Sequence, residues 1–256
     1  MADVRINLVS AVDAVIMALS QDIFSLAFAP GMKLTEADLA ERYCVSRNTI
    51  RETIAHLVNS GILVKVANRG IYIKKITIQD VRELFHLRKL FELEAVSGIG
   101  QRGFIPPTLS AALIELQKAD AHQDWGAFVD ADAKFHLSLV EAAGSSRLTR
   151  LYQTIASEIK LCIAQSRRLL DDHHENMYDH RVIFELLQKN DIEGAANFLA
   201  RHLDSAVGDF ELVFEPHVSG KKPPSARAGR KSGALENPRE APNQQAREIL
   251  PENIIT

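Results

Sequence analysis

The segment from Leu34 to Ile73 constrains the fold more than any other part of the chain. It contains two short stretches in which apolar residues recur at three- and four-residue spacing, which is typical of helices with one buried face. These residues are Leu39, Ala40 and Tyr43 in the first stretch and Ile50, Ile54, Leu57 and Val58 in the second. Val45 fills the turn between them, and Ser46 is placed to cap the second helix. The segment therefore predicts a helix-turn-helix.

A β-hairpin is expected directly after the second helix. Gly61 ends that helix, and residues 62–66 alternate as a strand. Asn68, Arg69 and Gly70 have the composition of a tight hairpin turn, after which Ile71 and Ile73 form the returning strand. A hairpin in this place is the wing of a winged helix-turn-helix.

The second helix begins with residues that suit DNA, namely Arg47, Asn48, Thr49 and Arg51. A helix fits the major groove, where arginine can bind guanine and asparagine can bind adenine bidentately. Arg69, at the tip of the hairpin, can enter a minor groove or contact phosphate. Two arginines on a helix pair are by themselves also typical of a solvated surface, so the wing is what favours DNA binding.

The charge of the chain is unevenly distributed. The 256 residues carry a formal net charge of −3, divided as +2 in residues 1–75, −8 in residues 76–215 and +3 in residues 216–256. The acidic middle part is therefore not the DNA-binding surface. Binding by residues 1–75 must depend on locally clustered arginines and lysines, and should weaken strongly with salt.

Cysteine content and hydropathy indicate a cytoplasmic protein. The two cysteines, Cys44 and Cys162, fall in different predicted domains, so we expect reduced, buried thiols rather than a disulfide. No apolar run approaches the roughly 20 residues of a membrane-spanning helix. The acidic Asp3 argues against a secretory signal. We expect no membrane partner.

The remainder of the chain predicts an all-α bundle followed by a tail. Apolar periodicity and the breaks between the periodic stretches give six helices, at about 81–95, 108–122, 125–143, 148–170, 177–189 and 192–214. After Pro216 the composition changes to Gly, Pro, Ser, Lys, Asn and Gln, which favours disorder. The predicted domains are a winged helix-turn-helix at 1–75, a helical domain at 76–215 and a disordered tail at 216–256.

The predicted bundle holds a candidate metal site. Asp132 and His136 are four residues apart and so lie on one face of a helix, while His180 and His202 lie on the apolar faces of two later helices. Three imidazoles and a carboxylate suit a divalent transition metal such as Zn²⁺, Ni²⁺, Mn²⁺ or Fe²⁺. Taken singly, a histidine of this kind is more often a hydrogen-bonded core residue than a metal ligand, and the Asp132–His136 pair is also compatible with an ordinary helix interaction.

The N-terminal segment resembles a known family. Residues 12–73, with Ala29-Pro30-Gly31-Met32-Lys33-Leu34 and Ser46-Arg47-Asn48-Thr49-Ile50-Arg51-Glu52 within them, are similar to the GntR family of bacterial transcription regulators. The resemblance implies that Arg47, Arg51 and Gly70 lie on double-stranded operator DNA. Many relatives have an arginine where this chain has Ala37, so one DNA contact of the family is missing here.

The helical part resembles the FCD domain, the C-terminal ligand-binding domain of the FadR subfamily of GntR regulators. The similar segments are Asp132-Ala133-Lys134-Phe135-His136, Asp179-His180-Arg181-Val182-Ile183 and Ala200-Arg201-His202-Leu203. The resemblance implies that Asp132, His136, His180 and His202 hold a metal at the floor of a cavity, where a small organic acid completes the coordination. Relatives that bind acyl ligands lack this metal set. Arg88 corresponds to an arginine that points into the cavity, although a surface ion pair with Glu92 is an equal alternative.

The two resemblances together predict a repressor or activator that acts as a homodimer on two half-sites and responds to an acid through linkage. Two alternatives remain: a regulator that senses the metal itself, and a metalloenzyme fused to a DNA-binding arm. An enzyme is disfavoured because no motif places a general base and no GxxxxGK[ST] loop is present.

Overall fold

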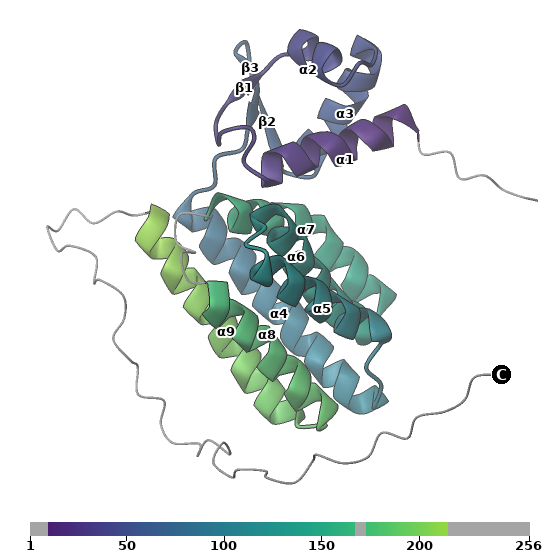
Figure 1. The fold of residues 1–256 in the computed structure, drawn as a ribbon, viewed down its shortest axis with the longest axis vertical. Coiled ribbons are helices and arrows are strands. Elements are labelled where there is room, and N and C mark those ends of the chain that lie inside the picture. Colours follow the sequence, from purple (N-terminus) through teal and green to yellow (C-terminus); the bar gives the residue numbers. More distant parts are fainter. Residues whose placement is uncertain (1–9, 167–172, 215–256) are drawn as a thin grey trace, which may run out of the picture. The chain divides into compact units, whose positions relative to one another are not determined.

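The protein is described by a computed structural model that covers residues 10–166 and 173–214. Its described residues are mostly helical, with one small antiparallel sheet (Figure 1). The N-terminal elements are α1 (Ala11–Phe24), β1 (Lys33–Leu34), α2 (Glu36–Arg42), α3 (Arg47–Asn59), β2 (Leu63–Val66) and β3 (Gly70–Ile73). The C-terminal elements are α4 (Ile78–Arg102), α5 (Pro107–Ala121), α6 (Trp125–Ala142), α7 (Ser146–Gln165), α8 (His173–Gln188) and α9 (Ile192–Phe214).

The predicted winged helix-turn-helix is confirmed. Helices α2 and α3 bury Leu39, Ile50 and Leu57. The hydroxyl of Ser46 accepts a hydrogen bond from the backbone N–H of Thr49 at 3.1 Å and so caps α3.

The wing contains one more strand than the sequence pattern predicts. Strands β2 and β3 form the expected hairpin, and β1 pairs with β3 on its other edge, giving the order β1-β3-β2. The extra strand has only two residues, so no alternation of polar and apolar residues could mark it. In the hairpin turn, Asn68 and Gly70 have φ of 59° and 115°, which is the backbone region that favours such residues.

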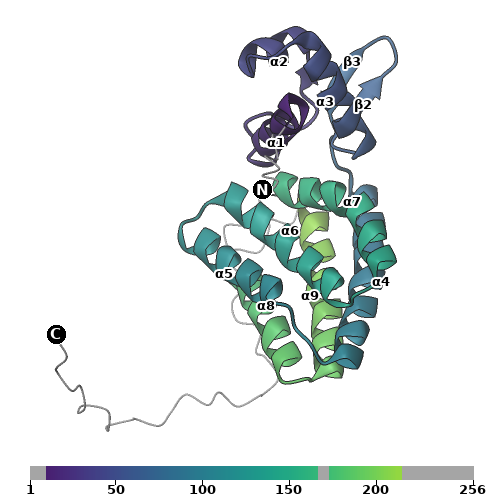
Figure 2. The same cartoon turned by 90° about the vertical axis from the view of Figure 1, so that its right-hand side faces the viewer.

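The predicted all-α bundle is also confirmed (Figure 2). Helix α4 packs against α6, α7 and α9, while α5 packs against α6 and α8. Helix α4 begins with a capping box, in which the side chains of Thr77 and Asp80 each accept a hydrogen bond from the other's backbone N–H. It ends at Gly103, whose φ of 61° makes a left-handed cap.

Three helices differ in their boundaries from the predicted ones. Helix α4 spans Ile78–Arg102 rather than about 81–95. Helix α7 ends at Gln165 rather than near residue 170, and the backbone N–H of Ser166 donates to the carbonyl groups of Cys162 and Ile163. Residues 167–170 lie outside the described part of the chain. Helix α8 begins at His173 rather than Met177. The polar residues before Met177 carry no apolar repeat from which a helix could be predicted.

The prediction that both cysteines are buried is confirmed for one of them and wrong for the other. Cys162 is buried, whereas Cys44 is exposed. Cys44 occupies the turn between α2 and α3 with a left-handed φ of 53°, and its neighbour Val45 is the residue that packs against the core. Both thiols are free, as expected.

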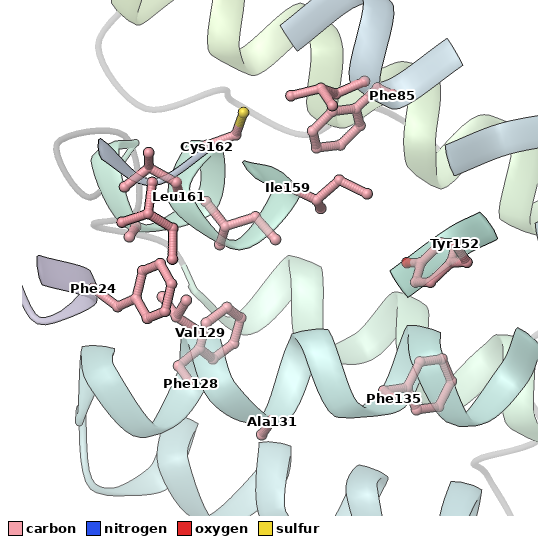
Figure 3. Packing of buried hydrophobic residues seen from close by; sticks show 14 of the residues in the cluster. Phe24, Phe85, Phe128, Val129, Ala131, Phe135, Tyr152, Ile159, Leu161 and Cys162 are labelled. Carbon is pink, nitrogen blue, oxygen red and sulfur yellow. The ribbon is translucent and has the colours of Figure 1, made fainter. Parts of the chain in front are cut away.

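Aromatic residues fill the interior of the bundle (Figure 3). Phe128 and Phe135 of α6 and Tyr152 of α7 are almost completely inaccessible to solvent. Tyr152 is polar at its tip, which raises the question of what its hydroxyl contacts.

The predicted tail at 216–256 lies outside the described residues. Within the described part, no helix combines the length and hydropathy needed to cross a membrane.

Candidate metal centre and DNA-binding surface

Helix α6 supplies two of the predicted metal ligands. Asp132 and His136 are one helical turn apart, and their side chains point into the bundle, with exposed fractions of 3% and 0%. Phe135 lies between them in sequence and packs edge-on against the ring of His180, with ring centroids 4.9 Å apart. This contact fixes the position of His180, which comes from α8.

The structure brings the four predicted ligands together. One ring nitrogen from each of His136, His180 and His202 lies within 4.8 Å of the other two, and all three histidines are buried. Nε2 of His136 is 3.0 Å from Nε2 of His180. Oδ1 of Asp132 is 3.0 Å from Nε2 of His180 and 3.8 Å from Nε2 of His136. Asp132 therefore belongs to the same cluster as the three histidines.

Carboxylates outside the cluster contact the opposite nitrogens of two of the rings. Nδ1 of His136 is 2.7 Å from Oε2 of Glu92, and Nδ1 of His202 is 3.1 Å from Oδ2 of Asp179. A carboxylate accepts a hydrogen bond from an N–H group, so each contact favours the proton on Nδ1. Nε2 of both rings then carries a lone pair, which in His136 lies 3.0 Å from Nε2 of His180.

Arg88 forms the predicted ion pair with Glu92, but the pair is buried rather than on the surface. Nε of Arg88 donates to Oε1 of Glu92 at 2.8 Å, and both side chains are at most 3% exposed. Nη2 of Arg88 lies 3.5 Å from Oδ2 of Asp132. Neither of these two atoms has a hydrogen-bond partner among the described residues. Two buried polar atoms are thus left facing each other beside the histidines.

The buried groups shift one another's pKa values. Burial alone would raise the pKa of Asp132, but the neighbouring His136, His180 and Arg88 lower it below its usual range. Burial lowers the pKa of His136 well below 6.5, and the positive charge of Arg88 adds to this effect. Burial also lowers the pKa of His202, against the opposing effect of Asp179. The cluster therefore combines an ionised carboxylate with neutral imidazoles at His136 and His202, which is the protonation state that metal ligands require.

The donor set fits a divalent transition metal. Ligand atoms that share an ion at bond lengths near 2.1 Å lie roughly 3 Å from one another. The separations of 3.0 and 3.8 Å among Asp132, His136 and His180 are close to that value. Imidazole nitrogen with carboxylate oxygen suits Zn²⁺, Ni²⁺, Mn²⁺ or Fe²⁺ rather than Ca²⁺ or Mg²⁺.

Sequence reasoning missed three residues of this centre. Tyr152 gave no signal, because its position in α7 is one of several apolar positions. Asp179 precedes His180 in a quoted motif, but only the structure shows its contact with His202. Glu92 was considered only as a partner of Arg88, whereas it contacts a metal-ligand candidate as well.

A cavity of about 740 Å³ lies away from the histidines. It is formed by the C-terminal end of α4, the start of α5 and the end of α8, and its lining includes Arg102, Phe104, Ser110 and Phe184. None of the candidate ligands and neither Arg88 nor Glu92 contributes to it. This cavity is therefore distinct from the one that the resemblance implies above the metal.

The residues predicted to bind DNA lie at the surface of the N-terminal domain. Arg47, Asn48 and Arg51 are exposed at the start of α3, Thr49 is half-buried beside them, and Arg69 is exposed at the tip of the wing. Gly70 follows Arg69 and begins β3. Arg51 pairs with Glu36 at 2.8 Å, and Asn48 donates to Glu52 at 2.7 Å. Among the described residues, no hydrogen bond or ion pair engages the side chain of Arg47 or that of Arg69.

Comparisons with known proteins agree with both halves of the fold. Residues 11–73 match the family of bacterial regulatory proteins described as the gntR family, and residues 83–205 match the FCD domain. The Nta operon transcriptional regulator of Aminobacter aminovorans is 28% identical over 75% of this chain and 89% of its own length. The uncharacterised HTH-type regulator YdhC of Bacillus subtilis is 29% identical over 77% of this chain and 89% of its own.

A solved structure shows the same architecture. The crystal structure of a GntR transcriptional regulator from Rhodococcus sp. RHA1 superimposes with a TM-score of 0.70 at 25% identity, covering 78% of this chain and 96% of that one. The winged helix-turn-helix, the helical domain that follows it in the sequence and these relatives lead to one assignment. The chain is a transcriptional regulator of the GntR family, with an N-terminal GntR helix-turn-helix domain and a C-terminal FCD domain.

Proposed function

We propose that this regulator binds operator DNA with an affinity set by a small carboxylic acid, which reaches a metal ion in the FCD domain. The observation that carries the proposal is the buried cluster of Asp132, His136, His180 and His202 beside Arg88. The motifs that carry these residues resemble those of the metal-binding members of the FadR subfamily. Operator binding takes place in the bacterial cytoplasm, so we assign the protein to that compartment.

In this proposal the four clustered side chains are the metal ligands. Nε2 of His136 and Nε2 of His202 are available, because carboxylates hold the opposite nitrogens. When bound, a divalent transition metal supplies a Lewis-acidic centre with open positions to which acid oxygens can bind. Burial keeps both histidines neutral, so no proton has to leave them when an ion binds near pH 7.

Arg88 is the residue that we expect to bind the acid directly. Its Nη2 is buried without a hydrogen bond, and a buried guanidinium nitrogen is costly unless it has a partner. A carboxylate oxygen placed beside the metal ligands would give Nη2 that partner. Polar ligand atoms are required here, which favours a small hydroxy, keto or dicarboxylic acid over a fatty-acyl chain.

The acid can reach this site only if side chains or helices move, because the four ligands and Arg88 are at most 7% exposed. A ligand whose binding requires another arrangement of the bundle shifts the population towards it. Helix α7 connects the site to the linker that follows the wing. Its residue Tyr152 contacts Glu92, and its residue Gln165 bonds both the backbone N–H of Ile76 and the carbonyl group of Lys74.

On the DNA side, we propose that Arg47 and Arg51 contact operator bases, with Asn48 and Thr49 beside them, and that Arg69 and Gly70 place the wing against the DNA. Arg51 and Asn48 would exchange their partners Glu36 and Glu52 for the DNA. Because the pair of Arg51 and Glu36 is exposed, its loss costs about 0–1 kcal/mol, less than a bidentate base contact provides. We propose a homodimer, because a two-fold pair of such domains matches two half-sites.

The proposal is tested by measuring operator affinity in a matrix of metal and acid. Fluorescence anisotropy with the promoter DNA next to the protein's own gene is recorded for the chelated protein, then with Zn²⁺ or Mn²⁺, each with and without malate, citrate or glucuronate. We expect at least a tenfold change in affinity, equivalent to about 1.4 kcal/mol of coupling, only when metal and an active acid are both present. His180→Ala should abolish the response while leaving basal DNA binding intact.

Two outcomes would contradict the proposal in different ways. A response to metal alone, without any acid, would favour the direct metal sensor. If operator affinity is the same with every combination of metal and acid, the protein binds DNA but the proposed control by metal and acid is wrong.

A further inference from the structure

Glu92 is a fully buried carboxylate whose two oxygens have different partners. Oε2 lies 2.7 Å from Nδ1 of His136. Oε1 accepts from Nε of Arg88 at 2.8 Å and from the hydroxyl of Tyr152 at 2.9 Å. These contacts join helices α4, α6 and α7 at one carboxyl group. Glu92 is not one of the four metal-ligand candidates, so its burial needs an explanation of its own.

We propose that Glu92 is a positioning residue that holds His136 in the one tautomer able to bind the metal, while it fixes the guanidinium of Arg88. The inference rests on the metal site of the proposed function and names a residue through which that site is built. Glu92 does not touch the metal in this arrangement, because its contact is with the far side of the His136 ring.

Two carboxylates compete as acceptors of the His136 proton, while Nε2 of His180, 3.0 Å from Nε2 of His136, can donate to that ring or accept from it. Glu92 lies 2.7 Å from Nδ1, whereas Oδ1 of Asp132 lies 3.8 Å from Nε2. The shorter distance is a hydrogen bond and the longer one is not. Glu92 therefore draws the proton to Nδ1 and leaves the Nε2 lone pair facing His180. Without Glu92, Asp132 would be the nearer carboxylate to that ring and would favour the proton on Nε2, where it blocks metal binding.

The two oxygens of Glu92 have separate partners. Oε1 accepts from Arg88 and Tyr152, so only Oε2 is available to His136. A glutamine at this position has one accepting oxygen and one donating NH₂ group. If its oxygen remains with Arg88 and Tyr152, which are both donors, its NH₂ group must face Nδ1 of His136. Nδ1 then becomes the acceptor, and the proton moves to Nε2.

Asp179 offers an internal comparison. It contacts Nδ1 of His202 at 3.1 Å, but its side chain is 31% exposed, against 0% for Glu92. Water can replace a partly exposed carboxylate as acceptor more easily than a buried one. We therefore expect a larger effect from changing Glu92 than from changing Asp179.

The test compares Glu92→Gln, Glu92→Asp and the control Tyr152→Phe in the full-length chain. Glu92→Asp retains the negative charge near Arg88 but shortens the side chain by one carbon. Tyr152→Phe removes one hydrogen bond to Oε1 and leaves the Glu92–His136 contact in place. Zn²⁺ affinity is measured by competition with a chromophoric chelator. We expect both Glu92 variants to bind Zn²⁺ about 10–100-fold more weakly than the parent, and Tyr152→Phe to stay within about threefold.

A second measurement reports the tautomer directly. Long-range ¹H–¹⁵N spectra of the metal-free protein distinguish a protonated ring nitrogen from a bare one, and His136→Gln assigns the signals. The parent and Tyr152→Phe should carry the His136 proton on Nδ1, and Glu92→Gln should carry it on Nε2. The circular dichroism of each variant is compared with that of the parent. A shift of the His136 proton from Nδ1 to Nε2 in a variant with the parent's spectrum is then not caused by a loss of fold.

The outcomes separate this inference from the proposed function. Parent protein that binds no Zn²⁺ would contradict the proposed metal site, while the tautomer comparison would still decide the role of Glu92. Variants of Glu92 that keep both the Nδ1 proton and the parent's Zn²⁺ affinity would overturn the inference. So would failure of both variants to fold, since Glu92 would then support the bundle as a whole.

Discussion

Acidification below pH 6.5 should destabilise the metal-free FCD domain, and His202 should account for a measurable part of the loss. The pKa values of His136 and His202 lie below 6.5 in the folded protein because both rings are buried. In the unfolded chain they return to ordinary values. Between pH 7 and pH 5 the unfolded state therefore takes up protons that the folded state does not, so stability falls as the pH falls.

The magnitude follows from the linkage of protons to folding. A histidine that stays neutral in the folded state but titrates near 6.5 when unfolded costs at most about 2 kcal/mol of stability between pH 7 and pH 5, so the two together cost at most about 4 kcal/mol. Glu92 acts in the opposite direction, because burial raises its pKa and the folded state gains a proton there as the pH falls. This gain is at most about 2.5 kcal/mol, so the two histidines outweigh Glu92 when both stay neutral. Asp132, with its lowered pKa, contributes only below about pH 4.

Urea denaturation of the chelated protein at pH 7, 6 and 5 measures this loss. Trp125 is the only tryptophan in the chain and is buried in α6, so its fluorescence reports on the helical domain. His202→Gln should lose less stability than the parent between pH 7 and pH 5, by up to about 2 kcal/mol. The control His86→Gln changes an exposed histidine of α4 and should follow the parent. If His202→Gln and the parent show the same pH dependence, the assignment of His202 as a neutral, buried ring is wrong.

Three further predictions concern separate parts of the molecule. Zn²⁺ at one hundred times its Kd should stabilise the parent by about 2.7 kcal/mol in the same urea assay, and His180→Ala should abolish this gain; equal gains in both would exclude His180 as a ligand. Arg47→Ala should weaken operator binding, measured by fluorescence anisotropy, by about 1–3 kcal/mol. In the same assay, Arg69→Ala should lower the slope of log K against log salt concentration by about 0.9 if the wing contacts one phosphate. Phe135→Ala should cost about 3–5 kcal/mol of stability because the ring is fully buried, and a loss below 1 kcal/mol would contradict the packing around His180.

Local patterns allowed the fold to be predicted, because they are set by residues close together in the chain. The cap formed by Ser46 and Thr49 spans three residues, and the face shared by Asp132 and His136 spans one turn of α6. The short strand β1 was missed because pairing with β3, rather than its own sequence, makes it a strand.

The centre itself depends on contacts that no local pattern encodes. Tyr152 and Glu92 are 60 residues apart, and His136 and Glu92 are 44 apart. Periodicity shows which face of a helix is apolar, but not how far the helix is rotated or which neighbour it meets. For the same reason Arg88 and Glu92 could be predicted to pair at i,i+4, while their burial could not.

The charges of the buried centre support the proposed joint binding of an ion and an acid. Two carboxyl groups, those of Glu92 and Asp132, lie beside the single guanidinium of Arg88, so with both ionised these three side chains carry one net negative charge inside the bundle. A buried charge without a partner is costly, so this residual charge favours a cation. A divalent ion reverses the sign and leaves one net positive charge. A single carboxylate group beside Arg88 then restores neutrality, so the metal prepares the site electrostatically for an acid and disfavours a neutral ligand.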